Sequence, residues 1–147
     1  MLDIFTDDYF MKKALIEAQT AFEKGETPVG AIIVVNNKII ARSHNLTELL
    51  NDVTAHAEMQ AITAAANFLG GKYLINCTLY VTVEPCQMCA GALYWSQISK
   101  VVFGATDEKR GFQNLGAKLH PKTEIVSGIL EKECSDVMKL FFQNKRK

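Results

Sequence analysis

The most informative residues of this chain stand in two short stretches, Thr54-Ala55-His56-Ala57-Glu58 and Glu84-Pro85-Cys86-Gln87-Met88-Cys89. One histidine and two cysteines supply an imidazole nitrogen and two thiolate sulfurs, which are donors that Zn2+ prefers in proteins. A structural zinc site closes its fourth position with another Cys or His, whereas a catalytic site leaves that position to water. We therefore expect His56, Cys86 and Cys89 to hold a zinc ion with one open position.

Glu58 stands two residues after the histidine, and we expect it to act as a proton carrier. Residues i and i+2 of a helix diverge by about 200°, so Glu58 is not expected to be the fourth ligand. Zinc lowers the pKa of a bound water towards roughly 7, and a nearby carboxylate can take and return the proton. A Cys-x-x-Cys pair alone also fits a redox pair or half of a zinc finger. The glutamate has no role in such a closed site, which favours catalysis.

The composition is that of a single folded domain covering residues 1–147. Hydrophobic residues make up 48% and charged residues 22%, which predicts a buried core. Lys and Arg together number 16, as do Asp and Glu, so a surface for nucleic acid must be local.

The four cysteines and the N-terminus favour a cytoplasmic protein. Two cysteines are assigned to zinc, and we expect Cys77 and Cys134 to be reduced, buried thiols, as in a reducing compartment. The first eight residues lack a basic flank and a long apolar run, so no signal peptide is expected. No stretch is long and apolar enough to span a membrane.

Hydrophobic periodicity and turn residues predict four helices and five strands. The expected order is helix, strand, strand, helix, strand, helix, strand, strand, helix. Strands that alternate with helices predict a mixed sheet covered by helices on both faces. Both zinc-binding stretches open a helix after a strand, so they are expected to meet at one edge of the sheet. The expected helices are 7–24, 54–69 (starting at Val53 or Thr54), 85–95 and 130–142, and the expected strands are 31–35, 38–42, 78–83, 100–104 and 123–126.

The pattern His-x-Glu followed by Pro-Cys-x-x-Cys is the signature of the zinc-dependent cytidine and adenosine deaminases. Over nearly its whole length the chain resembles this superfamily, and specifically its bacterial tRNA-specific adenosine deaminases. The resemblance implies a three-layer α/β/α cytidine deaminase-like fold around a central mixed five-stranded sheet. It is carried by Thr27-Pro28-Val29-Gly30-Ala31, Asn45, residues 52–58, Leu79-Tyr80-Val81-Thr82, Glu84-Pro85-Cys86, Met88-Cys89-Ala90-Gly91-Ala92, Val101-Val102-Phe103-Gly104-Ala105, and Phe141-Phe142 followed by basic residues.

The resemblance also implies an activity. In that family the His and the two Cys bind one zinc per subunit, the Glu that follows shuttles protons, and the Asn that matches Asn45 contacts the flipped base. The enzyme is a homodimer, and the tRNA anticodon stem-loop lies across both subunits. The reaction converts the wobble adenosine to inosine and releases ammonia. Further candidates for substrate binding are Val29, Ala55 and Glu84, although Glu84 also fits a role in orienting the site.

Basic residues at two places are candidates for RNA contacts. By charge alone, Lys145-Arg146-Lys147 is typical of a solvated tail, and the resemblance favours contacts with phosphate groups. Lys109 and Arg110, in an expected loop, are candidates of the same kind.

Two departures from the tRNA-deaminase pattern keep alternatives open. Tyr94-Trp95 is more similar to bacterial guanine deaminases, and residues 107–121 form a shorter loop than usual. The alternative function is therefore deamination of a free base or nucleotide, such as guanine or cytosine, by the same zinc mechanism. We expect Tyr94 and Trp95 to be packing or dimer contacts. A third hypothesis, a non-catalytic zinc-stabilised RNA-binding or scaffold module, is disfavoured by the presence of Glu58.

Overall fold

The centre of the fold is a mixed sheet of five strands in the order β2-β1-β3-β4-β5. The structure, a computed structural model, describes residues 3–145. Strand β1 pairs antiparallel with both β2 and β3, whereas β3, β4 and β5 run parallel to one another. The expected mixed five-stranded sheet is thereby confirmed. The strands are β1 (Gly30–Val35), β2 (Lys38–His44), β3 (Thr78–Val83), β4 (Lys100–Ala105) and β5 (Glu124–Ser127).

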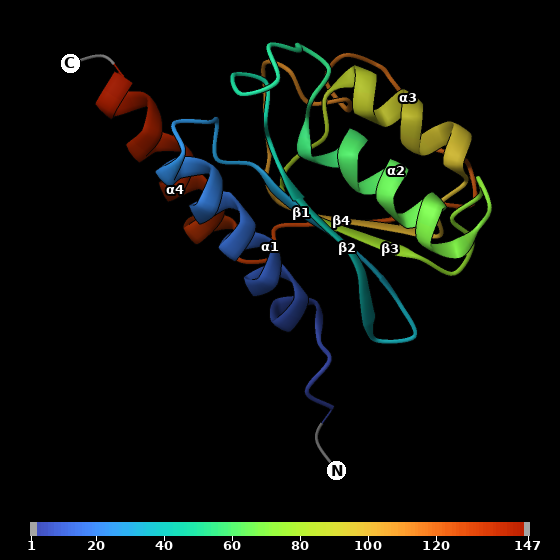
Figure 1. The fold of residues 1–147 in the computed structure, drawn as a ribbon. Helices are drawn as coiled ribbons and strands as arrows, with labels where there is room; N and C mark the ends of the chain where they lie inside the picture. Colours follow the sequence, from blue (N-terminus) through green and yellow to red (C-terminus); the bar gives the residue numbers. More distant parts are fainter. Residues whose placement is uncertain (1–2, 146–147) are drawn as a thin grey trace.

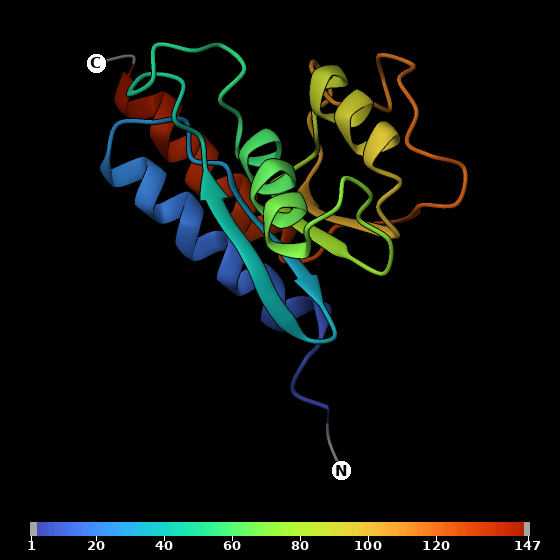
Figure 2. The ribbon, with the colours of Figure 1, turned by 45° about the vertical axis from the view of Figure 1, so that its right-hand side comes forward.

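Two helices cover each face of the sheet, which gives three layers (Figure 1). Helices α2 (Ala57–Leu69) and α3 (Gln87–Ser96) lie on one face, and α1 (Asp7–Glu23) and α4 (Glu131–Lys145) lie on the other. Because β2 leads into α2 and β3 leads into α3, both helices begin at the same edge of the sheet (Figure 2).

Local sequence fixes the ends of these elements. Thr6 caps α1 by accepting the Tyr9 N–H at 3.1 Å, and two aspartates in the first turn suit the positive end of the helix. Asn36 and Asn37 both have positive φ angles, of 50° and 62°, as the tight hairpin turn between β1 and β2 requires. Gly70 ends α2 with a φ of 69°.

Some element boundaries differ from those that the sequence predicts. Helix α2 begins at Ala57, because the Asp52 carboxylate accepts the Thr54 N–H at 2.8 Å and the Thr54 hydroxyl at 2.7 Å and so holds a turn there. Helix α3 begins at Gln87 rather than at Pro85. Helix α4 continues to Lys145, three residues beyond its expected end.

The sheet divides the apolar interior into two clusters. In one cluster, strand side chains on one face of the sheet pack against α2 and α3. In the other, strand side chains on the opposite face pack against α1 and α4. Cys77 belongs to the first cluster and Cys134 to the second, and both are buried free thiols, as expected. Their burial explains their presence without any metal or redox role.

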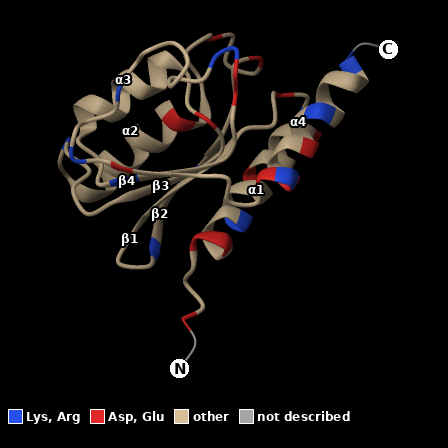
Figure 3. Ribbon diagram, turned by 180° about the vertical axis from the view of Figure 1, so that it is seen from behind, with Lys and Arg blue, Asp and Glu red and all other residues tan. Residues whose placement is uncertain are grey.

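Charged residues are spread over the helices and loops rather than gathered on one face. Acidic and basic residues both occur along α1 and α4 (Figure 3). Among residues 3–145, no helix combines the length and apolar character needed to cross a membrane.

Gly30 is the point where β1 touches α1, and its substitution tests the packing of these two layers. A Cβ at this position would overlap the main-chain oxygen of Ala14 and the main-chain nitrogen of Ala18, neither of which can rotate away. We expect Gly30→Ala to lower the free energy of unfolding by about 1–3 kcal/mol in urea titrations. Gly71→Ala, where a Cβ meets no atom within 4 Å, is the matched control and should change it by less than about 0.5 kcal/mol. Equal urea midpoints of unfolding for the two variants would contradict the close packing of β1 against α1 at Gly30.

Candidate metal centre

The two zinc-binding stretches meet where α2 and α3 begin. His56 is the N-cap of α2 and Cys86 is the N-cap of α3, and both have extended backbone angles. Neither side chain makes a capping hydrogen bond to its own helix. Their donor atoms therefore remain available for another partner.

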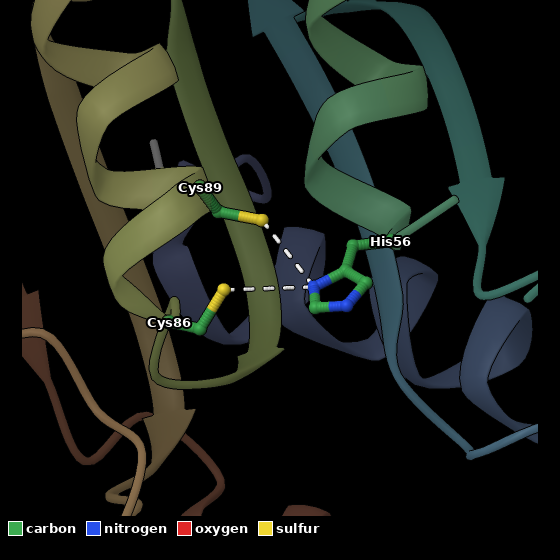
Figure 4. Close-up of side chains that lie close together, drawn as sticks. All are labelled: His56, Cys86 and Cys89. Atoms are coloured by element: carbon green, nitrogen blue, oxygen red, sulfur yellow. Dashed lines mark hydrogen bonds between the residues drawn. The ribbon is translucent and has the colours of Figure 1, made fainter. Parts of the chain in front are cut away.

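The imidazole and the two thiols converge on one point (Figure 4). The Nδ1 atom of His56 lies 3.6 Å from the sulfur of Cys86 and 3.6 Å from the sulfur of Cys89. Tetrahedral zinc, with bonds of about 2.3 Å to sulfur and about 2.0–2.1 Å to nitrogen, places such atoms about 3.6 Å apart. In the part of the chain that the structure describes, these residues form the one cluster of at least three potential ligands. The donor set and its spacing thus fit zinc.

Hydrogen bonding prepares one thiol for metal binding. The pKa of Cys86 is lowered to about 4, chiefly because the Cys89 thiol donates a hydrogen bond to it and also because His56 lies beside it. The pKa of Cys89 is raised, since this residue keeps the proton that it donates. A cation bound at this point would displace that proton, because thiolates rather than thiols ligate metals.

Glu58 lies in the first turn of α2 and is almost completely buried. Burial raises its pKa to about 7, and the charge of Cys86 adds to the rise. A carboxyl group with this pKa can both accept and donate a proton near neutral pH. Its oxygens lie outside the cluster of three ligand atoms.

Asn45 is fixed beside the start of α2. Its side-chain oxygen accepts the Ala57 N–H at 2.8 Å, so the amide NH2 group of this buried side chain is held in one direction. Within residues 3–145 this NH2 group makes no hydrogen bond, which leaves two donors for a ligand. The other two candidates pack nearby: the Val29 carbonyl accepts the Asn45 N–H, and the Ala55 carbonyl accepts the Leu46 N–H.

Glu84 is also buried, but both of its carboxylate oxygens are engaged by main-chain groups. One accepts the Asp107 N–H at 3.1 Å, and the other accepts the Gln113 N–H at 3.1 Å. The same loop is tied to the metal-binding stretch by the hydrogen bond from the Phe112 N–H to the Pro85 carbonyl. These contacts favour the orienting role for Glu84 over direct contact with substrate.

The predicted basic contacts stand in two separate places. Lys109 and Arg110 are exposed in the loop after β4, where Asp107 accepts both of their main-chain N–H groups. Lys145 is exposed at the end of α4, with its ammonium group 5.2 Å from the centre of the Phe141 ring. Arg146 and Lys147 lie outside the described residues.

A pocket of about 500 Å³ between this loop and α4 contains residues that the sequence did not single out. Besides Lys109, it is lined by five residues that recur at helical spacing on one face of α4. Their spacing of three and four could have identified this face, although helical spacing is more often a sign of core packing. These residues are Ser135, Met138, Lys139, Phe142 and Gln143.

Tyr94 and Trp95 stand near the end of α3, in the same helix as Cys89. Their rings lie 5.6 Å apart, and the Tyr94 ring lies 5.7 Å from that of His120. Trp95 is 77% exposed, so packing within the described chain does not explain it. A contact with a second subunit remains a prediction for this residue.

The ligand set can be tested by comparing the four cysteines. We expect Cys86→Ser and Cys89→Ser to lose zinc in metal analysis of the purified protein, because a serine hydroxyl does not replace a thiolate ligand. Cys77→Ser and Cys134→Ser, at buried cysteines of the two apolar clusters, should retain it. Zinc retention by both Cys86→Ser and Cys89→Ser would reject this centre.

Comparison with known proteins agrees with this geometry. The family model of the cytidine and deoxycytidylate deaminase zinc-binding region matches residues 5–105. The tRNA-specific adenosine deaminase of Bacillus subtilis is 48% identical over 147 residues, covering 96% of this chain and 91% of that protein.

Two solved structures add to this comparison. One, from "Biochemical and Structural Studies of A-to-I Editing by tRNA:A34 Deaminases at the Wobble Position of Transfer RNA", has a TM-score of 0.80 and 41% identity, covering 88% of this chain and 98% of that chain. The other, guanine deaminase from Bacillus subtilis, has a TM-score of 0.68 and 37% identity, covering 77% of this chain and 71% of that chain. The expected cytidine deaminase-like fold is confirmed, and the chain belongs to the cytidine and deoxycytidylate deaminase family.

Proposed function

We propose that this chain is a zinc-dependent hydrolase that deaminates the wobble adenosine of a tRNA anticodon loop to inosine and releases ammonia. The observation that carries the proposal is the cluster of His56, Cys86 and Cys89, with the buried Glu58 beside it. The chain is similar to tRNA-specific adenosine deaminases over nearly its whole length, which supports a tRNA substrate.

The chemistry needs an activated water and a group that moves protons. Zinc, when bound by the His and the two Cys, supplies a Lewis acid that lowers the pKa of a water molecule to about 7. Glu58 takes a proton from the attacking water and passes it to a ring nitrogen of the base. With the new C6–O bond formed, Glu58 takes the second proton from the hydroxyl on C6 and passes it to the amino group, so that the C6–N6 bond breaks, ammonia departs and the C6 carbonyl of inosine remains.

Asn45 orients the base in this proposal. Its side-chain oxygen is already committed to α2, so its NH2 group is the part that can recognise a substrate. Acceptor nitrogens on the edge of an adenine ring are suitable partners. Val29, whose carbonyl accepts the Asn45 N–H, and Ala55, whose carbonyl accepts the N–H of the next residue, are proposed as the apolar wall beside it.

A single-stranded loop suits a buried reaction centre. The target base must leave the RNA and enter the site, which costs less from an unpaired loop than from a duplex. Lys109, Arg110 and the residues 145–147 are proposed to contact phosphate groups, joined by Lys139 of the pocket beside α4.

We further propose that the chain is one domain that works as a homodimer in the cytoplasm, with one zinc per subunit. The exposed Trp95 and Phe68, at 77% and 67%, favour an interface on the side of α2 and α3. A mass equal to the 16.3 kDa chain in light scattering at micromolar concentration would contradict the dimer.

Deamination of a free base, with the same catalytic groups, is the second candidate. The similarity to a guanine deaminase and the Tyr94-Trp95 pair favour it. The distinction between the two candidates lies in the substrate rather than in the metal centre.

A substrate comparison decides between the two candidates. The zinc-loaded protein is incubated with a wobble-adenosine tRNA, its anticodon stem-loop, guanine and cytosine, and inosine and ammonia are measured. We expect inosine at the wobble position only, with both free bases unchanged. Turnover of guanine or cytosine with RNA unchanged would reject the RNA substrate and retain the zinc chemistry.

Substitution of Glu58 tests its role as proton carrier. We expect Glu58→Gln to keep the zinc content and the circular dichroism spectrum and to lower kcat by about 10²–10⁴-fold, because the amide cannot accept the proton. Glu23→Gln, at an exposed position of α1, is the control and should keep full activity. Loss of zinc from Glu58→Gln would show that Glu58 is a ligand.

A further inference from the structure

Glu26 is a buried carboxylate that the reaction chemistry does not use. It follows Gly25, whose φ of 77° ends α1, and its own N–H is bound to the Ala21 carbonyl at 2.9 Å. This hydrogen bond fixes the main chain of Glu26 to the end of the helix. The residue is 2% exposed.

Its two carboxylate oxygens bind neighbouring main-chain groups of a single loop. One accepts the Glu48 N–H at 3.0 Å, and the other accepts the Leu49 N–H at 2.8 Å. Within the described part of the chain, no lysine or arginine forms an ion pair with Glu26. Burial of a carboxylate is costly unless hydrogen bonds compensate it. The buried Glu26 carboxylate therefore fixes the position of the loop that contains Glu48 and Leu49.

The loop leads from the end of β2 to the start of α2 (Figure 2). Residues 46–55 connect Asn45, the candidate for base recognition, to the ligand His56. The Leu46 N–H donates to the Ala55 carbonyl at 3.0 Å and closes the base of the loop. The outer half also has main-chain hydrogen bonds within the loop, such as the Leu50 N–H to the Leu46 carbonyl, and Glu26 ties this half to the end of α1. Removal of Glu26 should therefore loosen the outer half and leave the metal centre in place.

The outer half carries apolar side chains that face solvent. Leu49, Leu50 and Val53 are 71%, 54% and 84% exposed. Three such residues within five positions, beside a reaction centre, indicate a contact surface rather than core packing. The apolar faces of unstacked nucleotide bases are ligands that such a surface suits.

We propose that Glu26 is a positioning residue, which fixes the 46–55 loop as a wall against which the RNA substrate packs. Glu26 itself touches no reacting atom. The identity of the ligand rests on the proposed function, whereas the placement of the loop by Glu26 does not.

The test compares Glu26→Ala and Glu26→Gln with Glu23→Gln in the zinc-loaded full chain. With the anticodon stem-loop as substrate, we expect Glu26→Ala to raise KM about tenfold while kcat stays within about threefold and the zinc content is unchanged. Glu26→Gln, which keeps one acceptor oxygen, should fall between Glu26→Ala and the unsubstituted chain. Glu23→Gln, exposed at the end of α1, should match the unsubstituted chain.

Hydrogen exchange gives a second measurement that does not depend on activity. In both Glu26 variants the Leu49 amide should exchange faster, while the Ala57 amide, which Asn45 holds, should keep its protection. Leu49→Ser and Val53→Ser alter the exposed surface without removing the Glu26 carboxylate, and each should also raise KM.

Three results would overturn the proposal. Unchanged exchange at Leu49 would show that Glu26 does not hold the loop. Faster exchange with an unchanged KM would show that the loop is not a wall for RNA. A parallel loss of zinc and kcat would show that Glu26 serves the fold as a whole. Failure of the unsubstituted chain to deaminate any RNA would instead reject the proposed function, and the exchange measurement would still decide whether Glu26 positions the loop.

Discussion

The structure depends on one geometric constraint, which is that an imidazole and two thiols lie within bonding distance of a single point. His56 and Cys86 are 30 positions apart, and strand β3 lies between them in the chain. The sheet satisfies the constraint because α2 and α3 pack on the same face and begin at the same edge. Buried alanines of α2, such as Ala61 and Ala65, allow this helix to lie close against the sheet. The packing of the layers thus positions the Nδ1 atom of His56 and the sulfur atoms of Cys86 and Cys89.

The electrostatics of the centre follow from the same arrangement. The N-terminal ends of two helices carry partial positive charge, which favours thiolates and carboxylates there. Cys86 lies at one of these ends and Glu58 lies within the first turn of the other. Burial acts in the opposite direction on Glu58 and raises its pKa into the range of proton transfer. A single environment therefore holds a charged ligand and a titrating carboxyl group side by side.

The sequence predicted the number, order and type of the elements because helical spacing of apolar residues, short runs of β-formers and turn residues mark them. It placed the start of α2 too early, because Thr54 is a suitable N-cap residue ahead of an alanine-rich stretch, whereas the Asp52–Thr54 turn delays the helix to Ala57. The convergence of His56, Cys86 and Cys89 on one point could be predicted because these donor types, in this order, are what a zinc site requires. The loop contacts of Glu26 and Glu84 could not, since their partners are main-chain N–H groups 22 to 29 positions away, which leave no mark on the sequence.

The candidate metal ligands lie at the starts of helices, whereas the neighbouring surface comes from loops, and this affects how the fold can evolve. The three candidate ligands lie at the starts of α2 and α3, whereas the neighbouring loops 46–55 and 107–113 are each held to the rest of the domain partly through one buried carboxylate. The three candidate ligands lie outside both loops, so the ligand residues themselves are retained when an exposed loop position such as Leu49 is exchanged. A lineage can thus acquire a new preference among nitrogenous bases while its hydrolytic machinery stays inherited, and the similarity of this chain to both an adenosine and a guanine deaminase is consistent with such a history.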